Sequence, residues 1–146
     1  MHAQPVQLTD EEVAGRLRMA VNRLQRRLRQ ESLEGLSPAQ ASALGSVRRH
    51  GGPTLGELAA IEQVQPPTMT RIVASLAEAG MVTRVADAND RRSARVRITP
   101  AGERTLERMR TRKNAFLVRR LGDLSPDERR HATELVALLE HLLAEP

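Results

Sequence analysis

The chain has no cysteine, tryptophan or tyrosine, and Phe116 is the only aromatic residue among its 146. Without thiols, disulfide scaffolds, cysteine catalysis and thiolate metal sites are excluded. The shortage of aromatic residues argues against β-sandwiches and barrels, whose cores use aromatic and β-branched side chains. It also argues against single-stranded nucleic-acid modules, because these stack bases on aromatic rings.

Long apolar runs are also missing. No stretch approaches the roughly 20 residues that span a bilayer, and the first residues lack a signal-peptide core. We therefore expect a cytoplasmic protein with no membrane partner. The chain has no phosphate loop of the G-x-x-x-x-G-K type and no legible Ser/His/Asp triad, and its four histidines do not form a helical metal motif. We expect no enzyme activity, no metal and no cofactor.

Arginine is abundant instead. The net charge is +5, and Lys113 is the only lysine among 23 basic residues. The planar guanidinium of arginine matches phosphates and guanine edges, although an arginine-rich codon composition would give the same bias. Residues 64–98 hold six arginines and three acids, whereas residues 123–146 hold two arginines and six acids. The middle of the chain is therefore the region expected to face an anion.

Apolar periodicity and cap residues predict six helices and one hairpin. The helix starts are signalled by Thr9, Ser37, Thr54, Gln65, Thr99 and Ser125. Residues 81–85 and 94–98 are predicted strands, and a polar loop over 87–92 joins them. The third helix is expected to bury Leu55, Leu58, Ala59 and Ile61, and the last helix Ala132, Leu135, Val136, Leu139, Leu142 and Leu143. The predicted fold is mainly α with a small β-hairpin wing, in the order α-α-α-α-β-β-α-α.

A short helix, a tight turn, a second helix and a hairpin make a winged helix-turn-helix. The second helix must present a polar side to a major groove about 12 Å wide. An inward face of Met69, Ile72, Val73 and Leu76 leaves the opposite side free. The candidate major-groove residues are Gln65, Pro67, Thr68, Thr70, Arg71 and Ser75. The N-terminus of this helix is expected to attract a phosphate through free N–H groups.

The hairpin is a candidate minor-groove wing. Arg91 and Arg92 lie at its tip, and Arg95 lies on its outward face. Arginines of such a wing enter a narrow minor groove, where negative potential is concentrated. Asp90 either supports a wing arginine through a charge-assisted hydrogen bond or serves only the turn. The candidate contacts to the DNA backbone are Thr54, Arg84 and Arg97.

Residues 55–102 resemble the DNA-binding core of the MarR family of bacterial transcription regulators. Asp90-Arg91-Arg92 is similar to the family's D-x-R wing, and the run from Ile98-Thr99 to Gly102 is similar to its L-T-x-x-G entry into the next helix. Residues 69–73 and 76–80 are similar to the recognition helix and its exit. One departure is Glu62-Gln63 in the helix-helix turn, where helix-turn-helix proteins often have glycine.

The resemblance implies a homodimer on pseudo-palindromic duplex DNA, usually a repressor and often released by a small lipophilic anion. Residues 1–35 and 100–146 would be dimerisation helices, and residues 36–99 the DNA-binding lobe. Arg92 would enter the minor groove, with Thr68, Thr70 and Arg71 in the major groove. An effector pocket would lie between the dimerisation helices and the lobe. Periodicity does not identify its residues, and we expect aliphatic and arginine side chains.

Two alternatives stay open at this point. The winged helix could be a protein–protein adaptor without specific DNA binding, in which case binding would respond little to salt. Duplex DNA binding weakens steeply with salt because counterions are released. The outer helices could also pack on each other within one chain instead of against a second copy.

Overall fold

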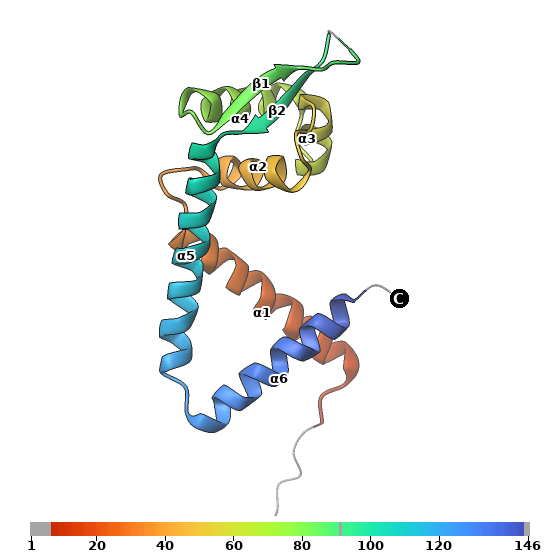
Figure 1. The fold of residues 1–146 in the computed structure, drawn as a ribbon. Helices are drawn as coiled ribbons and strands as arrows, with labels where there is room; N and C mark the ends of the chain where they lie inside the picture. The colour runs from red at the N-terminus through yellow and green to blue at the C-terminus, as the bar shows by residue number, and fades with distance from the viewer. Residues whose placement is uncertain (1–6, 91, 145–146) are drawn as a thin grey trace, which may run out of the picture.

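The computed structural model describes residues 7–90 and 92–144. Arg91 and the ends of the two predicted dimerisation segments, residues 1–6 and 145–146, lie outside the described residues. The elements are α1 (Asp10–Glu31), α2 (Pro38–Arg49), α3 (Leu55–Glu62), α4 (Pro66–Glu78), β1 (Val82–Ala86), β2 (Ala94–Ile98), α5 (Pro100–Gly122) and α6 (Pro126–Leu143). The predicted fold class and element order are confirmed (Figure 1).

Capping boxes begin four of the helices, α1, α2, α3 and α6. In each, a Ser or Thr side chain accepts the N–H three residues on, and a Glu or Gln side chain accepts the cap N–H in return. At α5, Thr99 Oγ1 accepts the N–H of Gly102 at 3.1 Å and donates to the carbonyl of Gly80 at 2.6 Å. This threonine therefore begins α5 and ties it to the end of α4.

The core lies where α2, α3 and α4 meet the hairpin and the first half of α5. Its side chains are Leu36, Ala41, Ala43, Leu44, Val47, Leu58, Ala59, Met69, Val73, Leu76, Val82, Val96, Leu106 and Met109. Leu55 packs against this cluster and is half-buried. The prediction that Ile61 faces inward is wrong, because its side chain is 38% exposed. It lies in the last turn of the eight-residue α3, on the rim of a surface cavity.

The two strands pair antiparallel, from Val82 opposite Ile98 to Ala86 opposite Ala94. β1 begins one residue later than predicted, and β2 has the predicted bounds. Beside β2, Val96 donates its N–H to the carbonyl of Pro53 at 2.8 Å, and Thr54 forms a bridge with Arg95. The hairpin is thus attached to the α2–α3 connection as well as to α4 and α5.

The outer helices leave apolar side chains uncovered. Neither α1 nor α6 has a buried residue, so the predicted burial by α6 is wrong within one chain. Leu135 is 47% exposed, Leu142 59% and Leu143 80%. Figure 1 shows α5 leading away from the lobe and α6 turning back from its far end. Among the described residues, no helix is both long and apolar enough to cross a membrane.

Candidate nucleic-acid interface

Helix α4 buries one side and exposes the other. Met69, Val73 and Leu76 are fully buried against the lobe. Along α4 and at its N-cap, the exposed residues include Gln65, Pro67, Thr68, Thr70, Arg71 and Ala74. Five of the six candidate major-groove residues are therefore exposed, and we call these five together the α4 face.

Ser75, the sixth candidate, is placed differently. It is half-buried, and its hydroxyl accepts a hydrogen bond from Gln40 Nε2 at 2.8 Å. Gln40 is also the capping-box residue of α2. Ser75 thus connects α4 to the start of α2, and its contact with a base stays a prediction.

The N-terminus of α4 does not offer the free N–H groups that we expected. Pro66 and Pro67 have no N–H, and the Thr68 N–H donates to the carbonyl of Gln65 at 3.0 Å. The Gln65 side chain makes no cap hydrogen bond. The Thr70 hydroxyl donates to the carbonyl of Pro66 at 3.0 Å, which leaves its oxygen free to accept. Side chains, rather than main-chain donors, must therefore make the contacts at this end.

The turn between α3 and α4 is formed without glycine. Gln63 has φ +54° and ψ +43°, which is the left-handed conformation. Its N–H donates to the carbonyl of Ala60 at 3.2 Å, and the Val64 N–H donates to the carbonyl of Ala59 at 3.0 Å. These bonds close the end of α3, so Gln63 takes the position where a glycine is often found.

Carboxylates at two positions shape the wing. Asp90 Oδ1 accepts the backbone N–H of Arg92 at 3.0 Å, so Asp90 serves the turn, which was one of its two expected roles. Asp87 Oδ1 accepts the N–H of Asn89 at 3.1 Å. Asp87 Oδ2 lies 3.4 Å from Arg95 Nη2, so among the described residues of the wing the carboxylate that pairs with an arginine side chain is that of Asp87.

Arg95 is held on both sides. Besides the ion pair with Asp87, its Nη1 donates to the carbonyl of Gly52 at 3.1 Å. We call these three residues the wing brace, because they connect the wing loop, β2 and the α2–α3 connection. Sequence reasoning missed Asp87. The available signal was its place at the end of β1, opposite the start of β2, where a hairpin brings its side chain near those of the partner strand.

The other candidate wing residues are distributed over different faces. Arg92 is exposed at the tip, and Arg97 is exposed on the same side of β2 as Arg95. Arg84 is exposed but pairs with Val96, so it lies on the opposite side of the hairpin from Arg95 and Arg97. Thr54 is half-buried, and its hydroxyl caps α3 by accepting the Glu57 N–H at 3.2 Å.

Comparison with known proteins decides the family. The family model described as the MarR family matches residues 36–94. An HTH-type transcriptional regulator of Mycobacterium leprae is 37% identical over 132 residues, which cover 88% of this chain and 92% of that protein. The chain belongs to the MarR family.

Other relatives agree with this assignment. The HTH-type transcriptional repressor MdtR of Bacillus subtilis is 29% identical over 111 residues, covering 75% of this chain and 72% of that protein. A transcriptional regulator from Thermotoga maritima, of known structure, matches with a TM-score of 0.80 at 25% identity. That match covers 92% of this chain and 95% of the other. This MarR-family chain is a winged helix-turn-helix transcriptional regulator.

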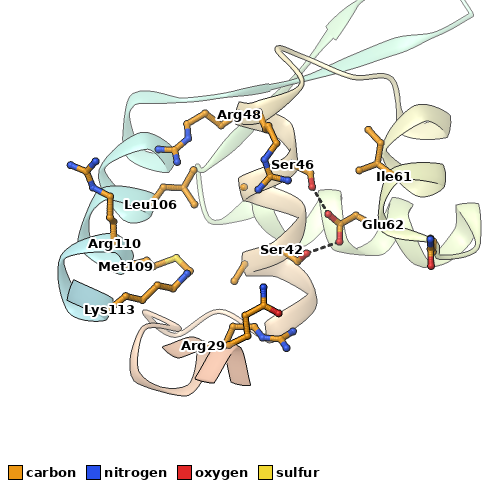
Figure 2. A pocket seen from close by; sticks show the side chains of 15 residues that line it. Arg29, Ser42, Ser46, Arg48, Ile61, Glu62, Leu106, Met109, Arg110 and Lys113 are labelled. Carbon is orange, nitrogen blue, oxygen red and sulfur yellow. Dashed lines mark hydrogen bonds between the residues drawn. The ribbon is translucent and has the colours of Figure 1, made fainter. Parts of the chain in front are cut away.

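A cavity of about 620 Å³ lies between the lobe and helices α1 and α5 (Figure 2). Its lining comes from α1, α2, α5 and the end of α3. The basic side chains in it are Arg29, Arg48, Arg49, Arg110 and Lys113, and Glu62 is the only acidic one. Ala41, Ile61, Leu106 and Met109 supply apolar surface. The lining combines basic and apolar side chains, and the use of this cavity as an effector pocket stays a prediction.

The described residues contain no cluster of three or more His, Asp or Glu side chains that could hold a metal ion. The arrangement thus offers two features for a polyanion, the α4 face and the arginine wing, together with one concave cationic site for a smaller anion.

Proposed function

We propose that this MarR-family regulator is a homodimeric repressor that binds a pseudo-palindromic duplex operator. One observation carries the proposal: the exposed α4 face and the braced arginine wing lie on the same small lobe, while the outer helices leave apolar faces uncovered. The repressing direction is supported by the relative MdtR of Bacillus subtilis, which is named a repressor. Such a protein would act in the cytoplasm, where a bacterial operator lies.

Each part of the lobe has a proposed role. Gln65, Thr68, Thr70 and Arg71 lie in the major groove, where polar side chains read base edges, and Pro67 and Ser75 contact its walls. Arg92, together with Arg91, enters the minor groove, and Arg95 positions the wing beside it. Thr54, Arg84 and Arg97 approach the phosphates. Residues 36–99 form the DNA-binding lobe in this proposal.

Residues 1–35 and 100–146 form the dimer interface in this proposal. In the described part of these two segments, the large exposed apolar side chains are Leu8, Val13, Met19, Val21, Leu24, Val118, Leu121, Leu135, Val136, Leu138, Leu142 and Leu143. Burying them against a twin chain gains roughly 25 cal/mol per Å². Charge also favours pairing, since residues 100–122 carry seven basic and two acidic side chains while residues 123–146 carry two and six.

The cationic cavity is the proposed effector site. Its five basic side chains come from α1, α2 and α5, and Leu106 and Met109 of α5 add apolar surface to the same lining. A lining of basic and apolar side chains suits an organic anion with an apolar body, because the charges attract the anionic group and the apolar side chains contact the rest. The site joins elements of the lobe and of the dimerisation helices, so its occupant can change how the two are arranged.

The test is a titration of the dimer with duplex DNA from the protein's own promoter, at several salt concentrations. We expect Arg92→Ala to weaken binding to every duplex about tenfold and to reduce the salt slope by about 1. Arg71→Ala should cost about 1–3 kcal/mol and relax base preference at one position in each half-site. Arg130→Ala, which removes the same charge from α6, is the matched control.

Two results would contradict the proposal. If both lobe variants bind like the Arg130→Ala control, the assigned DNA surface is wrong. If the wild type shows no salt-dependent binding to any promoter duplex, the adaptor alternative replaces DNA binding.

A further inference from the structure

Glu62 is the only carboxylate among the residues that line the cavity, and it is bound by two serines of α2 (Figure 2). Its Oε2 accepts the Ser42 hydroxyl at 2.7 Å, and its Oε1 accepts the Ser46 hydroxyl. The two serines lie one helical turn apart and therefore share a face of α2. We call these three residues the Glu62 clamp.

The clamp holds the point where the chain turns into α4. Glu62 is the last residue of α3, and Gln63, the next residue, is the left-handed residue of the turn. Ser46 is 3% exposed, so losing its acceptor would leave a hydroxyl without a partner in the interior. A movement of Glu62 therefore changes the end of α3 and, through Gln63, the start of the recognition helix.

The clamp and a bound anion compete. Each serine hydroxyl has one proton, and both protons are donated to Glu62, so an anion cannot receive them while the clamp is formed. The five basic side chains draw an anion into the cavity, where it meets the Glu62 carboxylate as a like charge. Among the described residues, no ion pair of Glu62 with a basic side chain offsets this repulsion.

We propose that Glu62 is a positioning residue that transmits occupancy of the cavity to the recognition helix. The formed clamp fixes the α3–α4 turn in the DNA-binding arrangement, and an organic anion in the cavity opens the clamp and lowers DNA affinity. By linkage, DNA lowers the affinity for the anion by the same factor. This inference rests on the proposed function of the cavity as an effector site.

The first test uses charge to separate positioning from electrostatics. Glu62→Gln removes a negative charge, which by itself favours DNA, but one amide oxygen cannot replace two carboxylate oxygens. We expect this variant to bind promoter duplex about tenfold more weakly than wild type. Glu78→Gln removes the same charge from the exposed end of α4 and should bind at least as tightly as wild type. Ser42→Ala, a milder change to the clamp, should weaken binding less than Glu62→Gln.

The second test measures coupling, with sodium benzoate as the probe and benzamide as its neutral counterpart. Benzoate should weaken DNA binding by wild type and by Glu78→Gln, and benzamide should not. In Glu62→Gln, benzoate should still bind, as followed by calorimetry, but should no longer change DNA affinity. If the role of Glu62 were purely structural, the ratio of the DNA affinities without and with benzoate would be the same in Glu62→Gln as in wild type.

The outcomes are distinct. The role of Glu62 is overturned if Glu62→Gln binds DNA as tightly as Glu78→Gln does. It is also overturned if benzoate weakens DNA binding equally in wild type and in both variants. A wild type whose DNA affinity ignores benzoate also overturns the coupling. A wild type that binds no duplex refutes the proposed function itself.

Discussion

Substituting Gly102 by alanine tests how closely α5 packs on the wing. Gly102 is buried in the first turn of α5. An added Cβ would overlap the carbonyl oxygen of Met81 and lie 2.7 Å from Ile98 Cγ1. The main chain of Met81 cannot give way freely, because the same carbonyl accepts the Thr99 N–H at 3.0 Å. Relief of the overlap therefore requires α5 to move away from the hairpin.

The cost can be estimated from these contacts. Overpacking of a filled site costs about 1–3 kcal/mol, and the strained Met81–Thr99 hydrogen bond adds about 1 kcal/mol. We therefore expect Gly102→Ala to lower the free energy of unfolding by about 2–4 kcal/mol, a large part of the roughly 5–15 kcal/mol of an ordinary domain. Gly56→Ala is the matched control, because nothing lies within 4 Å of its added Cβ. Because alanine favours a helix more than glycine does, Gly56→Ala in α3 should raise the free energy of unfolding by about 0.5–1 kcal/mol.

The assay is urea unfolding followed by circular dichroism, with all proteins at one concentration because dimer stability depends on concentration. A Gly102→Ala variant within about 0.5 kcal/mol of wild type, the range of ordinary surface substitutions, would refute the close approach of α5 to Met81. The same contact explains the glycine at this place in the sequence pattern: the backbone of Met81, just before β1, leaves no room for a side chain.

Three further outcomes are expected. Asp87→Ala should weaken duplex binding although it removes a negative charge, because it opens the wing brace. Arg95→Ala should weaken binding more, since it also removes a positive charge and the bond to Gly52, and the double variant should bind no more weakly than Arg95→Ala; additive losses would contradict this. Hydrogen bonds from the Ser125 backbone and hydroxyl hold the pKa of Glu128 below its usual range. The contribution of Glu128 to α6 stability is therefore present above its pKa in the unfolded chain, and it is lost as the pH falls through its pKa in the folded chain. Glu128→Gln should therefore flatten this acid loss of helicity in circular dichroism, and an unchanged acid transition would contradict it. Leu142→Asp should yield monomers in sedimentation at concentrations where wild type is dimeric, and a persisting dimer would place the interface elsewhere.

The helices were predictable because their start signals are local. Each capping box joins a residue to one three positions away, so the sequence shows both partners of Thr54 and Glu57, or of Ser125 and Glu128. The inward side of α4 followed from spacing alone for the same reason. Ile61 was placed wrongly because α3 is only eight residues long, and its last turn extends past the core.

The rest depends on contacts that spacing does not reveal. The ion pair of Asp87 with Arg95 requires the hairpin register, and the bond to Gly52 requires the α2–α3 connection beside β2. The Glu62 clamp joins residues twenty and sixteen positions apart. The cavity has walls from four helices, so no single periodic pattern identifies its lining. The spacing of apolar residues identified the apolar face of α6 correctly. Within one chain nothing buries that face, so the structure shows exposed side chains where burial was predicted.

In the proposed complex, the two lobes of a dimer bind one duplex together. The most direct test of this arrangement is the mass of the protein–DNA complex, measured by sedimentation velocity with a single promoter duplex. Two chains per duplex are expected, with recognition helices about one helical turn, roughly 34 Å, apart. The complex should dissociate steeply as salt is raised. A complex with one chain per duplex, formed by a protein that is monomeric on its own, would contradict the paired arrangement.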